Sequence, residues 1–207
     1  MILIDQIQEQ LRVLDSKSLR RRRRHAESPS EPRVKVDGRD MLAFCSNDYL
    51  GLAAHPKIVA ALQEGANLYG VGSGASHLIS GHSRAHAMLE QRLADFMAPH
   101  LVDANALYFC TGYMANLAVL SGLAAVAGKE TALFSETLNH ASLIDGAKLS
   151  RAQLQVYPHG DVASLRTMLA ASNAASKIVV TDSVFSMDGN LAPIPELLAL
   201  CEEFNAW

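Results

Sequence analysis

The chain has 207 residues, of which 49% are hydrophobic and 19% are charged, a composition typical of a folded globular protein. Its 18 Lys and Arg against 21 Asp and Glu give a net charge of −3, which predicts no general attraction to nucleic acid. No apolar run approaches the roughly 20 residues that span a bilayer, and no signal peptide is recognisable, so we expect a cytoplasmic protein that does not enter the membrane. Three scattered cysteines argue against a disulfide framework or a zinc site.

Residues 1–45 are predicted to form an N-terminal helix and a hairpin. Apolar residues at helical spacing indicate a helix over 3–24, which runs into the five arginines Arg20–Arg24. Asp37-Gly38 lies between two short extended pieces within 33–44, and this dipeptide is typical of a hairpin turn.

From residue 46 to residue 207 the pattern becomes an alternation of helices and strands. Short apolar strands bounded by helices are typical of a mostly parallel sheet that is covered on both faces. We therefore expect a three-layer αβα domain over this range. The alternation stops at Trp207 where another strand would follow, so we expect the domain to be incomplete. The predicted helices are 56–69, 83–97, 113–125, 141–148, 161–170 and 195–204, and the predicted strands are 106–110, 131–134, 154–157 and 178–181.

A glycine-rich stretch follows the second predicted helix. Gly70, Gly72 and Ala75 have the spacing of a dinucleotide-binding fingerprint, but that motif needs a preceding strand, and here a helix precedes it. Two interpretations remain. The backbone of this loop could closely approach a ligand or a neighbouring subunit, or the loop could be a flexible connection.

Three polar features lie at the same predicted edge of the sheet, where the strands end. Gly112 and Tyr113 begin a helix directly after a predicted strand, a position where N–H groups and the helix dipole attract anions. His140 begins the next helix, and its imidazole could stack on a flat ligand or move a proton. The hydroxyl of Ser186 follows a third strand. Each could also be an ordinary surface residue, but their shared edge favours a ligand site.

The arginine run has two interpretations that remain open. It could be a solvated helix end, or one arginine could pair with the carboxylate or phosphate of a ligand. The other histidines predict no metal site. They are His25, His55, His77, His82, His86, His100 and His159.

Five ordered motifs resemble the α-oxoamine synthases, which are fold-type I pyridoxal phosphate enzymes that condense an amino acid with an acyl thioester and release CO2. The resemblance implies the large domain of such an enzyme, a pyridoxal phosphate cofactor and a homodimer. The sequences of these motifs are most similar to those of members that use L-alanine and a pimeloyl thioester, rather than to those of sister members that use glycine or serine. The motifs are Ser46–Leu52, Gly72–Ser83, Cys110–Asn116, Leu138–Gly146 and Thr181–Asn190.

The resemblance also implies roles for individual residues. Gly112 and Tyr113 would hold the cofactor, and His140 would stack on its ring and contact the substrate. Ser186 would bond the phosphate or phenolic edge of the cofactor. Arg20 would contact the acyl substrate. Arg21 is the alternative, because the run of five arginines can be matched to the family pattern in two ways that differ by one residue.

The chain also departs from the family pattern. The family's ring-nitrogen Asp, a following His, and a later Thr and cofactor-binding Lys are not found, and none of the six lysines lies in the lysine motif. We therefore expect the chain to correspond to the N-terminal half of the enzyme and to be inactive alone. The alternative is a short product that binds a partner without catalysis.

Overall fold

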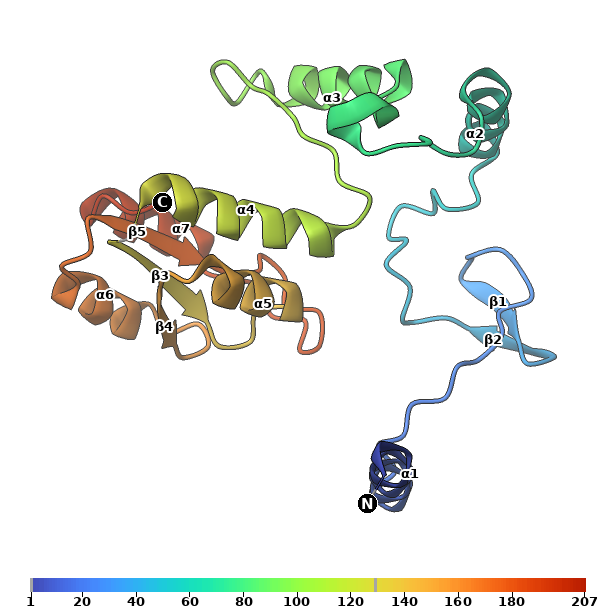
Figure 1. Ribbon diagram of the computed structural model, residues 1–207, viewed down its shortest axis with the longest axis horizontal. Coiled ribbons are helices and arrows are strands. Elements are labelled where there is room, and N and C mark those ends of the chain that lie inside the picture. The colour runs from blue at the N-terminus through green and yellow to red at the C-terminus, as the bar shows by residue number, and fades with distance from the viewer. Residues whose placement is uncertain (1, 129) are drawn as a thin grey trace. The chain divides into compact units, whose positions relative to one another are not determined.

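The computed structural model describes residues 2–128 and 130–207 (Figure 1). The chain divides into two compact units, Met1–Ala87 and Met88–Trp207. The predicted domain boundary at residue 45 stays a prediction. No described helix has both the length and the apolar character needed to cross a membrane.

The first unit contains short elements and a tight hairpin. Asp37 and Gly38 have φ values of 48° and 75°, so both adopt the left-handed conformation that a two-residue hairpin turn requires. The strands pair antiparallel, with Val34 opposite Met41. The elements of this unit are α1 (Leu3–Ser16), β1 (Arg33–Val36), β2 (Arg39–Leu42), α2 (Pro56–Tyr69) and the π-helix η1 (His77–Gly81), and α3 (Arg84–Met97) begins in it.

The first helix is shorter than predicted. It ends at Ser16, because Ser18 adopts a left-handed conformation with φ of 55° and the Leu19 N–H bonds back to the Leu14 carbonyl at 2.8 Å. The prediction of a helix that reaches Arg24 was therefore wrong. Arg20–Arg24 lie outside the helix, where five adjacent positive charges need not stack on neighbouring turns.

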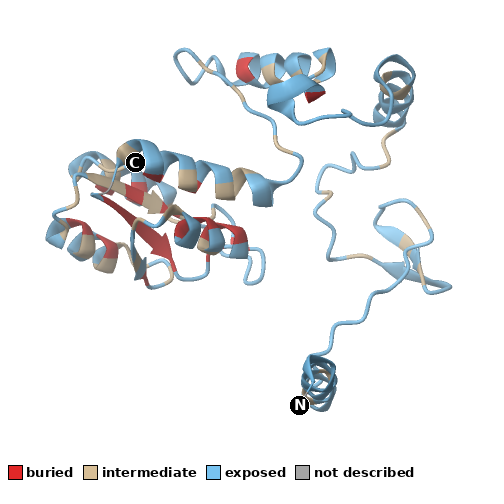
Figure 2. Ribbon diagram, in the orientation of Figure 1, coloured by how far each residue is buried: buried red, intermediate tan, exposed pale blue. Residues whose placement is uncertain are grey.

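The second unit is built on a parallel sheet with the strand order β4-β3-β5. The central strand β3 is buried along its whole length, as Figure 2 shows. The predicted alternation is thereby confirmed for these strands, as is the αβα fold. The elements are β3 (Thr131–Glu136), β4 (Gln153–Tyr157), β5 (Ser176–Val180), α4 (Gly112–Ala127), α5 (Ala141–Ser150), α6 (Val162–Ala171) and α7 (Ile194–Glu203).

Alternate residues of β3 build a separate core on each face of the sheet. Phe134 packs with Leu165 of α6 and Leu200 of α7. Leu133 points to the other face and packs with Leu120 of α4 and with α5. Because side chains alternate along a strand, one buried strand holds two helical layers together.

The predicted strand over 106–110 is not formed. The segment is extended but belongs to no sheet, and Leu107 is 80% exposed. The Tyr108 N–H donates to the Glu90 carboxylate at 3.0 Å instead of to a neighbouring strand. A strand needs a partner strand, and the described sheet of this unit offers none at this position.

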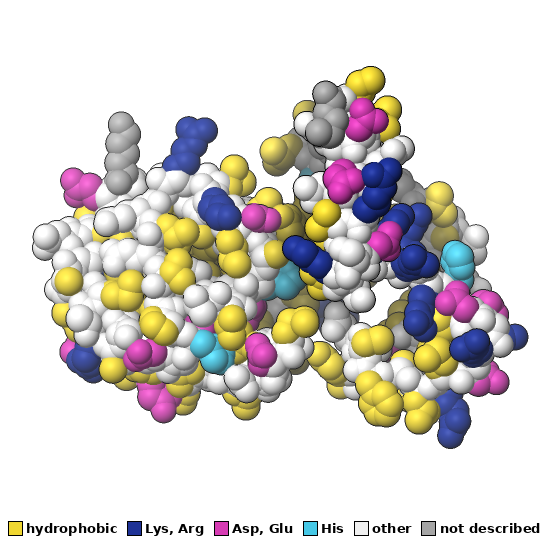
Figure 3. Space-filling view, turned by 90° about the horizontal axis from the view of Figure 1, so that it is seen from below, with side chains coloured by type: hydrophobic (Ala, Val, Ile, Leu, Met, Phe, Trp, Pro, Cys, Tyr) yellow, Lys and Arg dark blue, Asp and Glu magenta, His cyan; other side chains and the backbone are white. Residues whose placement is uncertain are grey.

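Large hydrophobic side chains are also exposed, as the yellow side chains in Figure 3 show. In the first unit they include Phe44, Val71 and Leu78, and in the second Val102 and Met187, each more than 90% exposed. Exposed apolar surface of this extent is typical of surfaces that contact other protein chains.

The contact between α4 and α5 depends on Gly146. A Cβ at this buried position would lie 3.0 Å from the Asn116 carbonyl oxygen and 3.1 Å from Cδ1 of Leu120. Glycine therefore lets the two helices approach closely, which fixes α5 against α4.

Substituting Gly146 with alanine should lower the free energy of unfolding by about 1–3 kcal/mol, because the added methyl group overpacks this contact. Gly122 on α4 is the matched control, since a Cβ there meets nothing within 4 Å. Gly122→Ala should raise stability by about 0.5–1 kcal/mol. Urea denaturation of both variants measures the difference, and equal stabilities would contradict the packing argument.

Candidate functional site at the carboxyl edge of the sheet

The start of α4 is suited to an anion. Thr111 is extended and caps the helix, with its Oγ1 accepting from the Met114 N–H at 3.1 Å. The first N–H groups of a helix have no acceptor within it, so those of Gly112 and Tyr113 are available to a ligand. A Cβ at Gly112 would meet nothing within 4 Å, so the backbone is open to close approach.

Tyr113 links this helix start to α5. Its hydroxyl donates to Oδ2 of Asp145 at 2.5 Å. This hydrogen bond raises the pKa of Tyr113, because ionisation would remove the donated proton and place two negative charges together. The phenol therefore remains a neutral donor, and the ring is held at the end of the sheet.

His140 is placed by the first turn of α5. Its Nδ1 accepts from the Ser142 N–H at 3.1 Å and lies 2.7 Å from the Ser142 hydroxyl. With Nδ1 as an acceptor, that hydroxyl donates to Nδ1, and its oxygen accepts from the Asn116 side chain of α4 at 2.9 Å. A neutral imidazole that accepts at Nδ1 carries its proton on Nε2, so the exposed ring can donate from Nε2 to a ligand.

Two polar side chains fix the backbone around His140. Oδ2 of Asp182 accepts from the His140 N–H at 2.7 Å, and the Asp182 N–H donates to the Asn139 side chain at 2.9 Å. The buried Asn139 amide donates to the Val180 carbonyl at 2.8 Å and to the Ser135 hydroxyl at 3.0 Å. This network joins the ends of β3 and β5 and holds His140 at the edge.

A second polar group lies where β3 ends. The buried Glu136 carboxylate accepts from the Leu138 N–H at 2.5 Å and lies 2.8 Å from Nδ1 of His159. Nε2 of His159 lies 3.0 Å from the Asn190 amide, and its ring contacts Phe185 edge to face. The loop after β4 is thus tied to the loop after β5.

Ser186 lies in the turn that follows β5. The bridge between Val184 and Leu191 closes this turn, and the Phe185 N–H donates to the Asn190 carbonyl at 2.9 Å. Ser186 itself is exposed. Within the described part of the chain, no hydrogen bond links Ser186 to the other candidate residues.

Arg20 and Arg21 belong to the first unit, whereas the other candidates belong to the second. The Arg20 guanidinium donates to Oδ2 of Asp15 at 2.6 Å, and this hydrogen bond holds the pKa of Asp15 below its ordinary value. Arg22 lies 3.6 Å from the other oxygen of the same carboxylate. Within the second unit, the structure connects Tyr113 and His140 through α4 and α5.

Sequence reasoning missed the side chains that orient the candidates. Asp145, Ser142 and Asn139 lie within the motif Leu138–Gly146, and Asp182 lies within Thr181–Asn190. A signal was present for Asn139 and Asp182, because each is a polar residue just after a strand end, where backbone groups need partners, whereas Ser142 and Asp145 lie within α5.

Comparison with known proteins places the chain in a family. Residues 39–207 match the family of class I and II aminotransferases, and the chain belongs to this family. This membership confirms the predicted fold class of fold-type I transferases.

Individual members of the family show which proteins this chain is similar to. The 8-amino-7-oxononanoate synthase of Janthinobacterium sp. (strain Marseille) is 70% identical over 205 residues, covering 99% of this chain and 51% of the relative. A solved structure of serine palmitoyltransferase from S. paucimobilis with bound PLP–myriocin aldimine is 28% identical, with a TM-score of 0.85 over 98% of this chain and 50% of that one. The 8-amino-7-oxononanoate synthase of Francisella tularensis is 30% identical, with a TM-score of 0.59 over 76% of this chain and 41% of that one. The chain spans about half the length of the curated relatives it matches.

Proposed function

We propose that this chain is part of an 8-amino-7-oxononanoate synthase, a pyridoxal phosphate enzyme of biotin biosynthesis. The reaction condenses L-alanine with a pimeloyl thioester and releases CO2 and the thiol carrier. The observation that carries the proposal is the 70% identity to a curated synthase over 99% of the chain. The likeness to a serine palmitoyltransferase solved with PLP supports the cofactor.

The residues at the sheet edge fit the cofactor. The open backbone at Gly112 and the first N–H groups of α4 suit an anionic phosphate. Pyridoxal phosphate, when bound, supplies an electron sink for the carbanion formed from the amino acid. We assign Gly112, Tyr113 and Ser186 to cofactor binding, with the exposed Ser186 hydroxyl as a donor to its phosphate or phenolic edge.

His140 is proposed to act by orientation. Its flat ring would limit the tilt of the cofactor, and its Nε2 proton would hold the carboxylate of the amino acid. Asp182 and Ser142 support this role, because they fix the backbone and the ring of His140. Arg20, or Arg21 in the alternative register, would contact the acyl substrate.

The partners of the chain follow from the same proposal. We propose a homodimer, which the exposed apolar side chains of both units support. The net charge of −3 gives no reason to expect a nucleic-acid partner, and we place the enzyme in the cytoplasm.

The 207-residue chain mixed with pyridoxal phosphate should not develop the long-wavelength absorbance of a lysine-linked cofactor, because none of its six lysines lies in the family's lysine motif. The measurement is a spectrum taken before and after dialysis. A band that survives dialysis and can be reduced onto one specific lysine would contradict this expectation.

The function itself is tested by amino-acid selectivity. Reading the DNA downstream of the Trp207 codon first establishes whether the reading frame continues with the rest of the enzyme. The protein so encoded is then assayed with alanine, glycine and serine against pimeloyl and other acyl thioesters. Preference for glycine or serine would assign the chain to a sister enzyme, and a frame that ends at Trp207 would favour a non-catalytic role.

A further inference from the structure

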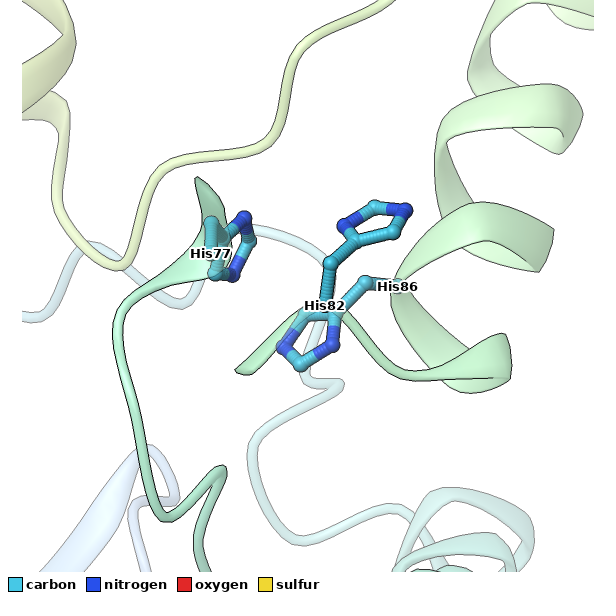
Figure 4. A group of neighbouring side chains, drawn as sticks. All are labelled: His77, His82 and His86. Carbon is cyan, nitrogen blue, oxygen red and sulfur yellow. The ribbon is translucent and has the colours of Figure 1, made fainter. Parts of the chain in front are cut away.

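Three histidines gather in the first unit at a place that the proposed function does not use. His77 begins η1, His82 follows its end, and His86 lies in the first turn of α3. The ring centroid of His77 lies 4.6 Å from that of His86 and 5.2 Å from that of His82. One ring nitrogen from each residue lies within 4.8 Å of the others. Figure 4 shows the three side chains as neighbours. Sequence reasoning predicted no ligand set here, although the separations of five and four residues lie within the range of histidine pairs in zinc sites.

From this geometry we propose that His77, His82 and His86 form a binding site for a divalent transition-metal ion of the zinc type. Imidazole nitrogen is the ligand that zinc, copper and nickel favour, whereas magnesium and calcium favour oxygen. Three histidines leave a fourth position of a tetrahedral site open to solvent or to another ligand. The proposal is independent of the proposed function.

The local backbone explains why the rings meet. Gly81 closes the π-helix, and a Cβ there would lie 1.9 Å from the Ala75 carbonyl oxygen and 2.9 Å from that of Ser76. Only glycine allows this turn, which brings His82 back toward His77. α3 then begins at Arg84, so that His86 in its first turn faces the same place.

Closing the site requires the three rings to approach one another. Metal–nitrogen bonds of about 2.0–2.1 Å in a tetrahedron separate the nitrogens by roughly 3.3 Å. The nitrogens now lie within 4.8 Å of one another, so the rings must approach by a further ångström or more. His77 and His82 are exposed, so their side chains lie outside a packed core.

Ser83 supplies the outer support that metal-binding histidines require. Its Oγ lies 2.9 Å from Nδ1 of His86, and its backbone N–H reaches the same nitrogen at 3.1 Å. The N–H contact uses the lone pair of Nδ1 and leaves the proton of a neutral ring on Nε2, so ligation through Nε2 requires that proton to move to Nδ1, where the Ser83 hydroxyl accepts it in place of the N–H contact. Such a partner orients the ring and raises its basicity as a ligand.

The test uses the 207-residue chain purified without a histidine tag. Isothermal titration with Zn²⁺ should show one site per chain, and Co²⁺ should give the visible absorption of a low-symmetry nitrogen site. His77→Asn and His82→Asn should each weaken Zn²⁺ binding at least 10-fold, and Ser83→Ala, which keeps all three ligands, about 10-fold. His100→Asn is the matched control, because this exposed histidine lies outside the cluster.

The outcomes separate the proposal from a general affinity of surface histidines. Absence of Zn²⁺ binding by the parent chain would overturn it. So would binding that falls as much in His100→Asn as in His77→Asn, or that is unchanged when His77 and His82 are replaced together. Circular dichroism of each variant shows that the fold is retained, and the Co²⁺ spectrum of the parent chain tests the site without any substitution.

Discussion

Substituting His140 with alanine in the complete enzyme should reduce turnover about 100-fold while cofactor binding persists, because misplacement of reacting groups by a small distance has effects of this size. The imidazole is held by Ser142, and its backbone is held by Asp182, so its ring is a rigid support for the reacting groups. The measurement is kcat with alanine and the thioester, together with a cofactor-binding titration.

Two further variants separate the ring from its role as a helix cap. His140 accepts from the Ser142 N–H, so alanine also removes the cap of α5, which is worth about 1 kcal/mol. His140→Asn restores a capping acceptor but no ring, and should keep the parent's stability while losing turnover. His140→Phe should recover stacking without the polar contact. Turnover close to that of the parent in His140→Asn would end the catalytic assignment.

The second large effect is expected at the arginine run. Arg20→Ala should lower kcat/KM for the thioester by about 10-fold to 100-fold and leave alanine binding nearly unchanged, because a charge-assisted contact is worth roughly 1.5–3 kcal/mol. Arg21→Ala decides the register, since only the residue that faces the substrate should show the loss. Steady-state kinetics with each substrate varied in turn measures both.

The ion pair of Arg20 supplies a control for this experiment. Arg20 and Asp15 are both 40% exposed, so their pair contributes little to stability. Asp15→Asn removes the pair but keeps the guanidinium, and should leave the thioester kinetics unchanged. If both arginine variants keep the parent's kinetic constants for the thioester, the arginine run is a solvated segment and the substrate assignment is wrong.

The sequence predicted the elements of the second unit well where a short apolar run is itself enough to indicate a buried strand or helix. The strands β3, β4 and β5 and their helices are short apolar runs with clear ends, and each appears within two or three residues of its predicted bounds. The segment 106–110 has the same apolar character but forms no strand, because pairing depends on a neighbour that local sequence does not specify.

The candidate site was predicted less completely for a related reason. Gly112 and His140 were recognisable because helix starts have sequence signals. The contacts of Asp182 and Asn139 join residues about 40 positions apart, so they follow from the strand order rather than from spacing. The histidine cluster was missed because the turn at Gly81, not a helical period, brings its members together.

The Asn139–Asp182 network has a consequence for the entropy of ligand binding. Loops at the end of a sheet are ordinarily mobile, and a ligand that orders them loses part of its binding free energy. Here the N–H groups of His140 and Asp182, though outside the strands, are already bonded to side chains anchored at β3 and β5. The buried amide of Asn139 therefore orders these loops when the sheet folds. A ligand that binds at this edge does not have to order them, so it keeps that part of its binding free energy.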